Sequence, residues 1–218
     1  ELRHEVEANW RITDQGIGKL FDADQQEMIR QIFLSIHSPE YATQVLEQVE
    51  HDNHGHGGFG GCSIALFGEP GSGKFEFVLT GRHVTRRCDG DSVEGAAFGG
   101  PIFYGHAARG FNEKPDHPGN IYWYQALRAN EVFGALDGKQ RVAALRTDPR
   151  QEDGVDTVKL REREASLAGV SLGELSADQR ELVKKVMADV LAPFREEDRT
   201  ESMKLIEAAG FENLHMAF

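Results

Sequence analysis

Histidines from several separate segments are the residues of this sequence best suited to carry out chemistry. His83 follows the strand-like sequence FVLTGR, His106 follows FYG, and His117 lies in the turn-like sequence DHPGN. His54 and His56 are separated by a single glycine in a glycine-rich segment. Neutral imidazole nitrogens bind zinc and copper, and a metal site forms where such ligands converge. The sequence therefore predicts a divalent metal site, with zinc or copper as the ion, drawn from these histidines.

Each predicted ligand also has an ordinary structural alternative. His54 and His56 fit a solvated, mobile loop, and His83 fits a core in which its ring is hydrogen bonded. Asp116 precedes His117 and is placed to orient that imidazole as a carboxylate behind the ligand. The residues alone leave the choice between ligand and structural histidine open.

The sequence GEPGSGK at residues 68–74 resembles a phosphate-binding loop, but two features argue against nucleotide binding. The residue after the lysine is Phe75, where a magnesium site requires serine or threonine. The following sequence, FEFVLTG, alternates like a strand, whereas a phosphate-binding loop opens a helix. Proline–glycine and serine–glycine pairs favour turns, so we predict a hairpin connection and no nucleotide cofactor.

The elements that must position the histidines begin with a predicted sheet over residues 60–105. The sequence CSIALFG and the stretch 75–85 read as strands separated by glycine-rich turns. Within the second strand His83 falls in line with Leu79 and Gly81 on the apolar face. A further strand is expected within residues 96–104, and short turns between consecutive strands predict mostly antiparallel pairing.

Three predicted helix starts share one pattern of an apolar residue, then Asp or Ser, then Gln three positions later. They are FDADQQEMI, LDGKQRVAAL and LSADQRELV. In a capping box the first side chain accepts an orphan backbone amide, and the glutamine bonds back to the cap. The patterns predict helices after Asp22, Asp137 and Ser176, which we interpret as similar caps rather than an internal duplication. Ser38 followed by Pro39 predicts another start.

The predicted architecture is one α+β domain over residues 1–218, with a central, mostly antiparallel sheet flanked by N-terminal and C-terminal helices. Its parts are helices in 1–50, the sheet in 60–105, helices in 121–146, a polar connector in 147–170 and helices in 171–218. Residues 51–61 are rich in glycine and are expected to form a loop. The last helix is expected over about residues 200–209 and ends at Gly210.

Composition argues against several classes of protein. Of 218 residues, 39% are hydrophobic, which suffices for a buried core. The net charge of −12 argues against a nucleic-acid partner, and we interpret Arg82, Arg86 and Arg87 as the polar face of a strand. No apolar run reaches the ~18 residues needed to span a bilayer, so no membrane span is expected. Cys62 and Cys88 can form a disulfide or remain free thiols.

The order of these motifs resembles domain-of-unknown-function family 3500. The sequence FGEP at 67–70 matches part of the family's S-I-F-G-x-P, and Gly81-Arg82-His83 matches a later G-H-H of which only the second histidine is kept. The helix start LSADQR resembles the family's L-S-x-x-Q-R. The likeness covers about residues 20–191 and implies a shared fold without an established activity. Members are commonly exported bacterial proteins, which favours an extracytoplasmic location for a chain beginning at Glu1 rather than Met.

Two kinds of function fit these observations. The first is a metal-dependent enzyme in which an ion held by histidines polarises water or a substrate carbonyl. The second is a non-catalytic module whose aromatic segment 111–133 contacts a small molecule, a protein partner or a second copy of the chain. Tyr122, Trp123 and Tyr124 are consecutive, and three consecutive aromatic residues on a helix cannot all face one core. The sequence leaves the choice between enzyme and module open.

Overall fold

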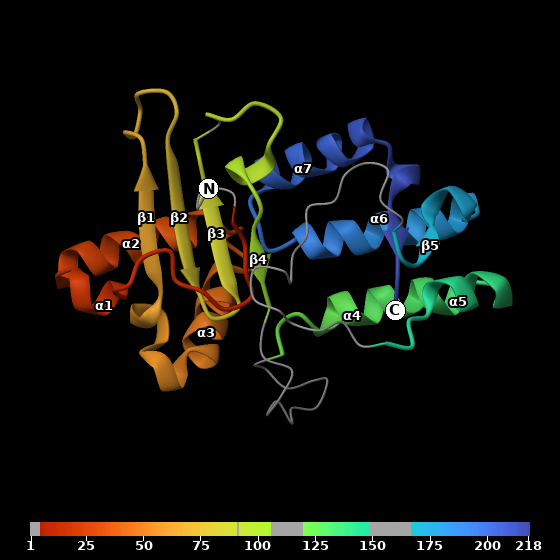
Figure 1. The fold of residues 1–218 in the computed structure, drawn as a ribbon, viewed down its shortest axis with the longest axis horizontal. Coiled ribbons are helices and arrows are strands. Elements are labelled where there is room, and N and C mark those ends of the chain that lie inside the picture. The colour runs from red at the N-terminus through yellow and green to blue at the C-terminus, as the bar shows by residue number, and fades with distance from the viewer. Residues whose placement is uncertain (1–4, 91, 106–119, 149–166) are drawn as a thin grey trace.

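The computed structural model of the protein describes residues 5–90, 92–105, 120–148 and 167–218. Its elements form two groups that lie side by side along the longest axis (Figure 1). The sheet lobe contains a four-stranded sheet and helices α1–α3, and the helical lobe contains helices α4–α7 and a small second sheet. The predicted α+β class, with helices before and after the sheet in the sequence, is confirmed.

The sheet lobe is formed by the earlier part of the chain. Its helices are α1 (Ile17–Leu20), α2 (Ala23–Ser35) and α3 (Ala42–Asp52). Its strands are β1 (Ser63–Phe67), β2 (Glu76–Gly81), β3 (Val84–Cys88) and β4 (Phe103–Tyr104). The strands lie in the order β1-β2-β3-β4, and each neighbouring pair is antiparallel. The sheet predicted between residues 60 and 105 is therefore confirmed.

The sequence GEPGSGK connects β1 to β2 as a hairpin. Phe67 pairs with Glu76 across the two strands, so no helix follows the lysine. Gly68 has a φ of 74° at the point where the chain leaves β1, a conformation that glycine adopts without a steric penalty. The predicted hairpin is confirmed.

The two faces of this sheet are covered differently. Phe77, Leu79 and Val84 lie on an apolar face whose core also contains Phe33 of α2 and Val45 of α3. The opposite face carries polar side chains, which are buried: Ser63, Glu76, Thr80, Thr85 and Arg87. Residues 5–13, which we call the N-terminal arm, hydrogen bond to this polar face. Both faces of the sheet are thus buried, one by helices and the other by an extended segment.

The helical lobe has its own core. Its helices are α4 (Trp123–Ala135), α5 (Gly138–Ala144), α6 (Ala177–Leu191) and α7 (Glu196–Ala209). Strand β5 (Val170–Ser171) pairs antiparallel with β6 (His215–Met216). Val132, Leu136, Leu172, Val183 and Phe211 are among the buried residues of this second core. Within the described residues no helix is both long and apolar enough to cross a membrane.

All three predicted capping boxes are present. Asp22, Asp137 and Ser176 each accept a hydrogen bond from the backbone amide of the glutamine three residues later, and each glutamine side chain bonds back to the cap. The boxes at Asp137 and Ser176 meet, since the side chains of Gln140 and Gln179 bond to each other. The shared pattern is therefore explained by cap chemistry, and in two cases by contact between the caps.

Two predicted helix starts are wrong. Helix α3 begins at Ala42 and not at Pro39, and residues 38–41 form a turn in which the Ser38 carbonyl accepts the Tyr41 amide at 3.0 Å. Helix α7 begins at Glu196, ahead of the predicted start at Thr200.

The predicted loop over residues 51–61 is also wrong. Helix α3 continues through Asp52, and short 3-10 helices follow at His54–His56 and Gly58–Gly61. The Asn53 carbonyl accepts the amides of His56 and Gly58, and the Asn53 side chain donates to the Val49 carbonyl at 2.9 Å. These bonds satisfy the end of α3 and the segment beyond it, so a glycine-rich sequence is held in tight turns.

The interpretation of the arginines as the polar face of a strand is correct for Arg87 but wrong for Arg86. Arg86 and Arg87 are both only 1% exposed, and they point to opposite faces of β3 because strand side chains alternate. Arg87 forms a buried ion pair with Glu76 at 2.9 Å, whereas Arg86 lies on the apolar face among aromatic rings. Each charge is placed by tertiary partners that are absent from the local sequence.

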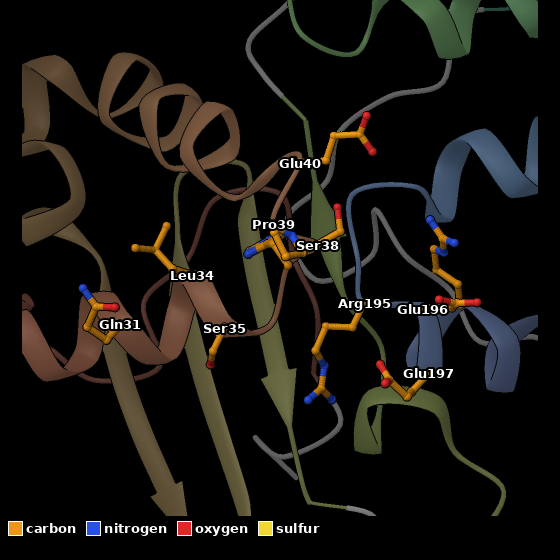
Figure 2. Close-up of a pocket in the computed structure, with 11 residues that line it drawn as sticks. Gln31, Leu34, Ser35, Ser38, Pro39, Glu40, Arg195, Glu196 and Glu197 are labelled. Atoms are coloured by element: carbon orange, nitrogen blue, oxygen red, sulfur yellow. The ribbon is translucent and has the colours of Figure 1, made fainter.

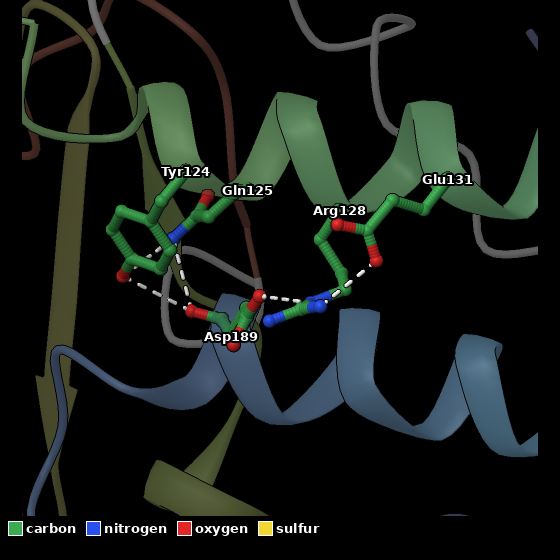
Figure 3. A network of polar contacts seen from close by, with 5 residues as sticks. All are labelled: Tyr124, Gln125, Arg128, Glu131 and Asp189. Atoms are coloured by element: carbon green, nitrogen blue, oxygen red, sulfur yellow. Dashed lines mark hydrogen bonds and ion pairs between the residues drawn. The ribbon is translucent and has the colours of Figure 1, made fainter.

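The lobes meet along a seam where the sheet lobe contacts the end of α6 and the link to α7. His37 and Phe194 form an isolated antiparallel bridge, and the Tyr104 hydroxyl donates to the Val190 carbonyl at 2.6 Å. Helices α4 and α6 are joined by the network in Figure 3. There the Asp189 carbonyl accepts from Tyr124 (3.1 Å) and Gln125 (3.1 Å), and its carboxylate binds Arg128 (3.0 Å).

Candidate functional site

A hydrogen-bonded pair of Asp52 and His83 is the arrangement of described residues closest to the predicted chemistry. His83 lies in the turn between β2 and β3, with a φ of 52° that is uncommon outside glycine. Its Nδ1 is hydrogen bonded to Oδ2 of Asp52, the last residue of α3. The side chains are 14% and 3% exposed, so the pair is largely shielded from water.

Neighbouring bonds hold the turn that carries His83. Its backbone nitrogen donates to the Ala8 carbonyl at 2.7 Å. Arg82 exchanges two long hydrogen bonds of 3.4 Å with the side chain of Asn53, and its Nε lies 3.9 Å from Oδ2 of Asp52. The end of α3, the arm and the hairpin turn therefore fix the imidazole together.

A carboxylate on Nδ1 prepares the other ring nitrogen for chemistry. It selects the tautomer in which Nε2 carries a lone pair, and it fixes the orientation of the ring. Such an Nε2 acts as a metal ligand or as a general base. Asp52 was not identified from the sequence, since 31 residues separate it from His83 and nothing local marks it.

The other predicted ligands are placed only in part. His54 and His56 are exposed on the 3-10 turn that follows Asn53, so the contact between Asn53 and Arg82 brings their segment to the His83 turn. His106 and His117 lie outside the described residues. Strand β4 ends at Tyr104, which pairs with Val84 beside His83. Within the described ranges no group of three His, Cys, Asp or Glu side chains is able to hold a metal ion.

The two cysteines do not add a nucleophile to this site. Both are free thiols. Burial raises the pKa of Cys62 to about 12, with a further contribution from Glu50. Burial also raises the pKa of Cys88, which pairs with Phe77 at the end of β3 away from His83. A raised pKa disfavours the reactive thiolate, so these residues have a structural character.

A second polar cluster lies in the seam and centres on Arg86. Its Nε donates to Nε2 of His37 (2.9 Å), and its Nη1 donates to the Phe103 carbonyl (2.7 Å). The guanidinium lies 5.4–5.7 Å from the ring centres of three aromatic side chains: Phe33, Tyr104 and Phe194. This arrangement is a buried cation supported by ring faces and hydrogen-bond acceptors. The sequence analysis missed this cluster, since the rings come from segments far from Arg86 in the sequence.

A groove of about 730 Å³ lies where the corner between α2 and α3 faces the start of α7 (Figure 2). The buried ring of His37 contributes to its wall, and the buried Oγ of Ser38 has no hydrogen-bond partner among the described residues. Arg195 is held by Asp198 at 2.8 Å. Both acidic and basic side chains line the groove, so its charge singles out no ligand class.

Comparison with known proteins gives one match that covers nearly the whole chain. The family described as "Protein of unknown function (DUF3500)" matches residues 8–218. No curated protein matches, and neither does any solved structure. The match includes the hairpin, the His83 turn and the capped helices described above, so the predicted resemblance is confirmed. The chain belongs to this DUF3500 family of proteins of unknown function.

Proposed function

We propose that this protein binds a divalent metal ion, zinc or copper, through Nε2 of His83. The observation that supports the proposal is the carboxylate of Asp52 on Nδ1 of the same ring. Histidines that bind metals almost always donate their second ring nitrogen to a carboxylate, carbonyl or water, which fixes the ring and its tautomer. This pair fits one ligand position of a metal site.

The remaining ligands in this proposal come from the predicted set. His54 and His56 belong to a segment tied to the His83 turn through Asn53, and His106 follows the end of β4 in sequence. His117 completes the set. Because the described residues supply no group of three ligands, the ion needs at least one ligand from outside them or a rearrangement of the exposed turn.

The chemistry that such an ion supplies is Lewis acidity toward a bound water or a substrate carbonyl. The chain's own contribution is positional. Asp52 keeps the His83 ring in one tautomer, and the hydrogen bond from the His83 amide to the Ala8 carbonyl keeps the turn in place. This is the metal-dependent alternative of the two functions expected from the sequence.

Metal analysis of the untagged full chain, purified without chelator, tests the proposal. We expect close to one equivalent of zinc or copper, which His83→Ala abolishes. Asp52→Asn is expected to weaken binding by about 10- to 100-fold, the usual effect of removing a carboxylate behind a metal-bound histidine. His215→Ala, at an exposed position on β6, is the matched control and should bind as the wild type does. Wild-type protein that takes up less than about a tenth of an equivalent would contradict the proposal.

A second candidate function is the ligand-binding module expected from segment 111–133, whose residues 111–119 lie outside the described part. What supports it is an apolar groove of about 560 Å³ beside α4. Gln125 of α4 borders this groove together with aromatic residues Phe98, Phe103, Tyr104 and Phe194. An apolar fluorescent probe should brighten when it binds the chain, and Ser202→Trp, which narrows the groove, should reduce this gain. Failure of apolar probes to brighten, or an unchanged gain in the variant, would count against this function.

A further inference from the structure

The polar face of the sheet has the properties of a binding surface. The side chains of Ser63, Glu76, Thr80 and Thr85 are on fully buried residues, and Arg87 is 1% exposed. Buried hydroxyl and charged groups are costly unless they are hydrogen bonded. Here many of their partners belong to the N-terminal arm, residues 5–13, which lies across the strands instead of extending the sheet.

Most of these bonds go to the main chain of the arm. The Ile12 amide donates to Oγ1 of Thr80 (2.9 Å), and the Thr13 amide donates to Oγ of Ser63 (3.5 Å). Arg87 donates from Nη2 to the carbonyl of Glu5. A surface that binds backbone groups recognises an extended conformation and tolerates many side chains.

Side chains at alternate positions anchor the arm. Val6, Ala8 and Ile12 are 7%, 7% and 8% exposed, and Trp10 between them donates from its indole nitrogen to Thr85 at 2.8 Å. In an extended segment, residues two apart point to the same side. Peptides that add to the edge of a sheet are also held by main-chain bonds and by anchors at alternate positions, and here the side chains of the sheet face supply those bonds.

The arm is held at the turn that carries His83. Ala8 accepts the His83 amide at 2.7 Å, Trp10 donates its amide to the Gly81 carbonyl at 3.5 Å, and Asn9 forms an isolated bridge with Arg82. Three consecutive residues of the arm thus contact the residues that precede and include His83. Removal of the arm frees the backbone of a residue that stands at a positive φ.

We propose that the polar sheet face is a peptide-binding surface whose resident occupant is the N-terminal arm. An extended peptide with small or apolar residues at alternate positions replaces the arm and forms the same backbone hydrogen bonds to the His83 turn. The surface binds through hydroxyl groups and Arg87, so its partner is an extended peptide and not a helix. This inference does not depend on metal binding at His83.

The test uses the full chain and a labelled peptide with the sequence of the arm, EVEANWRIT. In Ile12→Ala the chain's own arm loses an apolar side chain that anchors it. The arm then competes less well with the added peptide for the polar sheet face. We expect this chain to bind the peptide at least tenfold more tightly than the wild type does, in fluorescence anisotropy. A scrambled peptide of the same composition should not bind. Val142→Ala, at an 80% exposed position, is the control and should behave as the wild type.

Hydrogen exchange at the His83 amide gives a second readout. It should be faster in Ile12→Ala than in the wild type and should slow again when the peptide is added. If Ile12→Ala loses its circular dichroism spectrum, Trp10→Phe replaces it, since that change removes the indole bond to Thr85 and keeps an aromatic ring on the arm. A folded variant that binds the arm peptide no better than the scrambled one, or whose His83 amide exchanges at the wild-type rate, overturns the proposal. None of these measurements involves a metal ion, so their outcome does not test the proposed metal binding, which the metal analysis tests independently.

Discussion

Arg86 donates a hydrogen bond from Nε to Nε2 of His37 at 2.9 Å, in the seam between the lobes. Arg86 is 1% exposed and His37 is 3% exposed. Because Nε2 of His37 accepts this bond, its Nδ1 carries the proton and donates to the Phe33 carbonyl at 2.7 Å. Both nitrogens of a neutral imidazole are therefore used, and a second proton on the ring would face a buried cation. The seam requires His37 to be uncharged.

The first prediction is that His37 makes stability fall in acid. Burial, and next the charge of Arg86, lower the pKa of His37 from 6.5 to about 3. Between these values the unfolded chain binds a proton that the folded chain does not, so the stabilisation is full above pH 6.5 and is lost as the pH falls toward 3. The loss approaches about 1.4 kcal/mol per pH unit.

Urea unfolding between pH 7 and pH 4 measures this effect against His37→Gln, whose amide oxygen accepts from Arg86 without titrating. Carboxyl groups titrate in both chains, so the difference between the two curves isolates His37. We expect the wild type to lose stability faster than the variant as the pH falls. Parallel curves would show that His37 is not held neutral by the fold.

The second prediction concerns Arg86 itself. Arg86→Lys keeps the charge but loses the planar group that contacts three aromatic rings and the directed bond to His37. An unpaired buried acceptor costs about 1–3 kcal/mol, and the weakened ring contacts add to this cost. We expect a loss of about 3 kcal/mol by chemical denaturation.

Arg30→Lys is the matched control for Arg86→Lys. Arg30 pairs with Glu27 on the exposed surface of α2, where such pairs contribute little. Its replacement should leave the denaturant midpoint of unfolding unchanged. Equal effects at the two positions would mean that the seam does not depend on the guanidinium.

Features with local causes could be predicted from the sequence, and features with tertiary causes could not. The hairpin after Phe67 and the cap at Asp22 depend on residues within a few positions, and both are confirmed. The burial of Arg86 depends on rings from several distant segments. His83 was identified because a glycine-bounded strand ends there. Asp52, its partner, was missed because it looks like any acidic residue at the end of a helix.

The third prediction is that removal of one partner from the buried pair of Glu76 and Arg87 strongly lowers the free energy of unfolding. Both side chains are fully buried, and their atoms are 2.9 Å apart. Glu76→Gln leaves a buried guanidinium without its carboxylate, which costs about 3–5 kcal/mol. The double variant Glu76→Gln/Arg87→Met removes the charge as well and should recover part of that loss. Denaturant titration of both chains checks this, and a double variant less stable than Glu76→Gln would contradict it.

The fourth prediction is that two capping boxes of the helical lobe act as a unit. Gln179 donates to Gln140 (2.8 Å) and Gln140 donates back (3.2 Å), while each also serves its own cap, Ser176 or Asp137. Either Ser176→Ala or Asp137→Ala should cost about 1 kcal/mol. Together they should depart from additivity by about 0.5 kcal/mol or more, because the first change already loosens the glutamine that supports the second cap.

Asp22→Ala supplies the control for this coupling, since the Asp22 capping box lies on α2 in the other lobe. Its cost should add to that of Ser176→Ala within about 0.5 kcal/mol, as expected for separate sites. Thermal and urea unfolding of the single and double variants measure both cycles. The coupled pair must show the larger deviation, because only there do the two cap glutamines bond to each other. Equal deviations from additivity in the two double-mutant cycles would mean that the bonds between Gln140 and Gln179 do not couple the stabilities of the two caps.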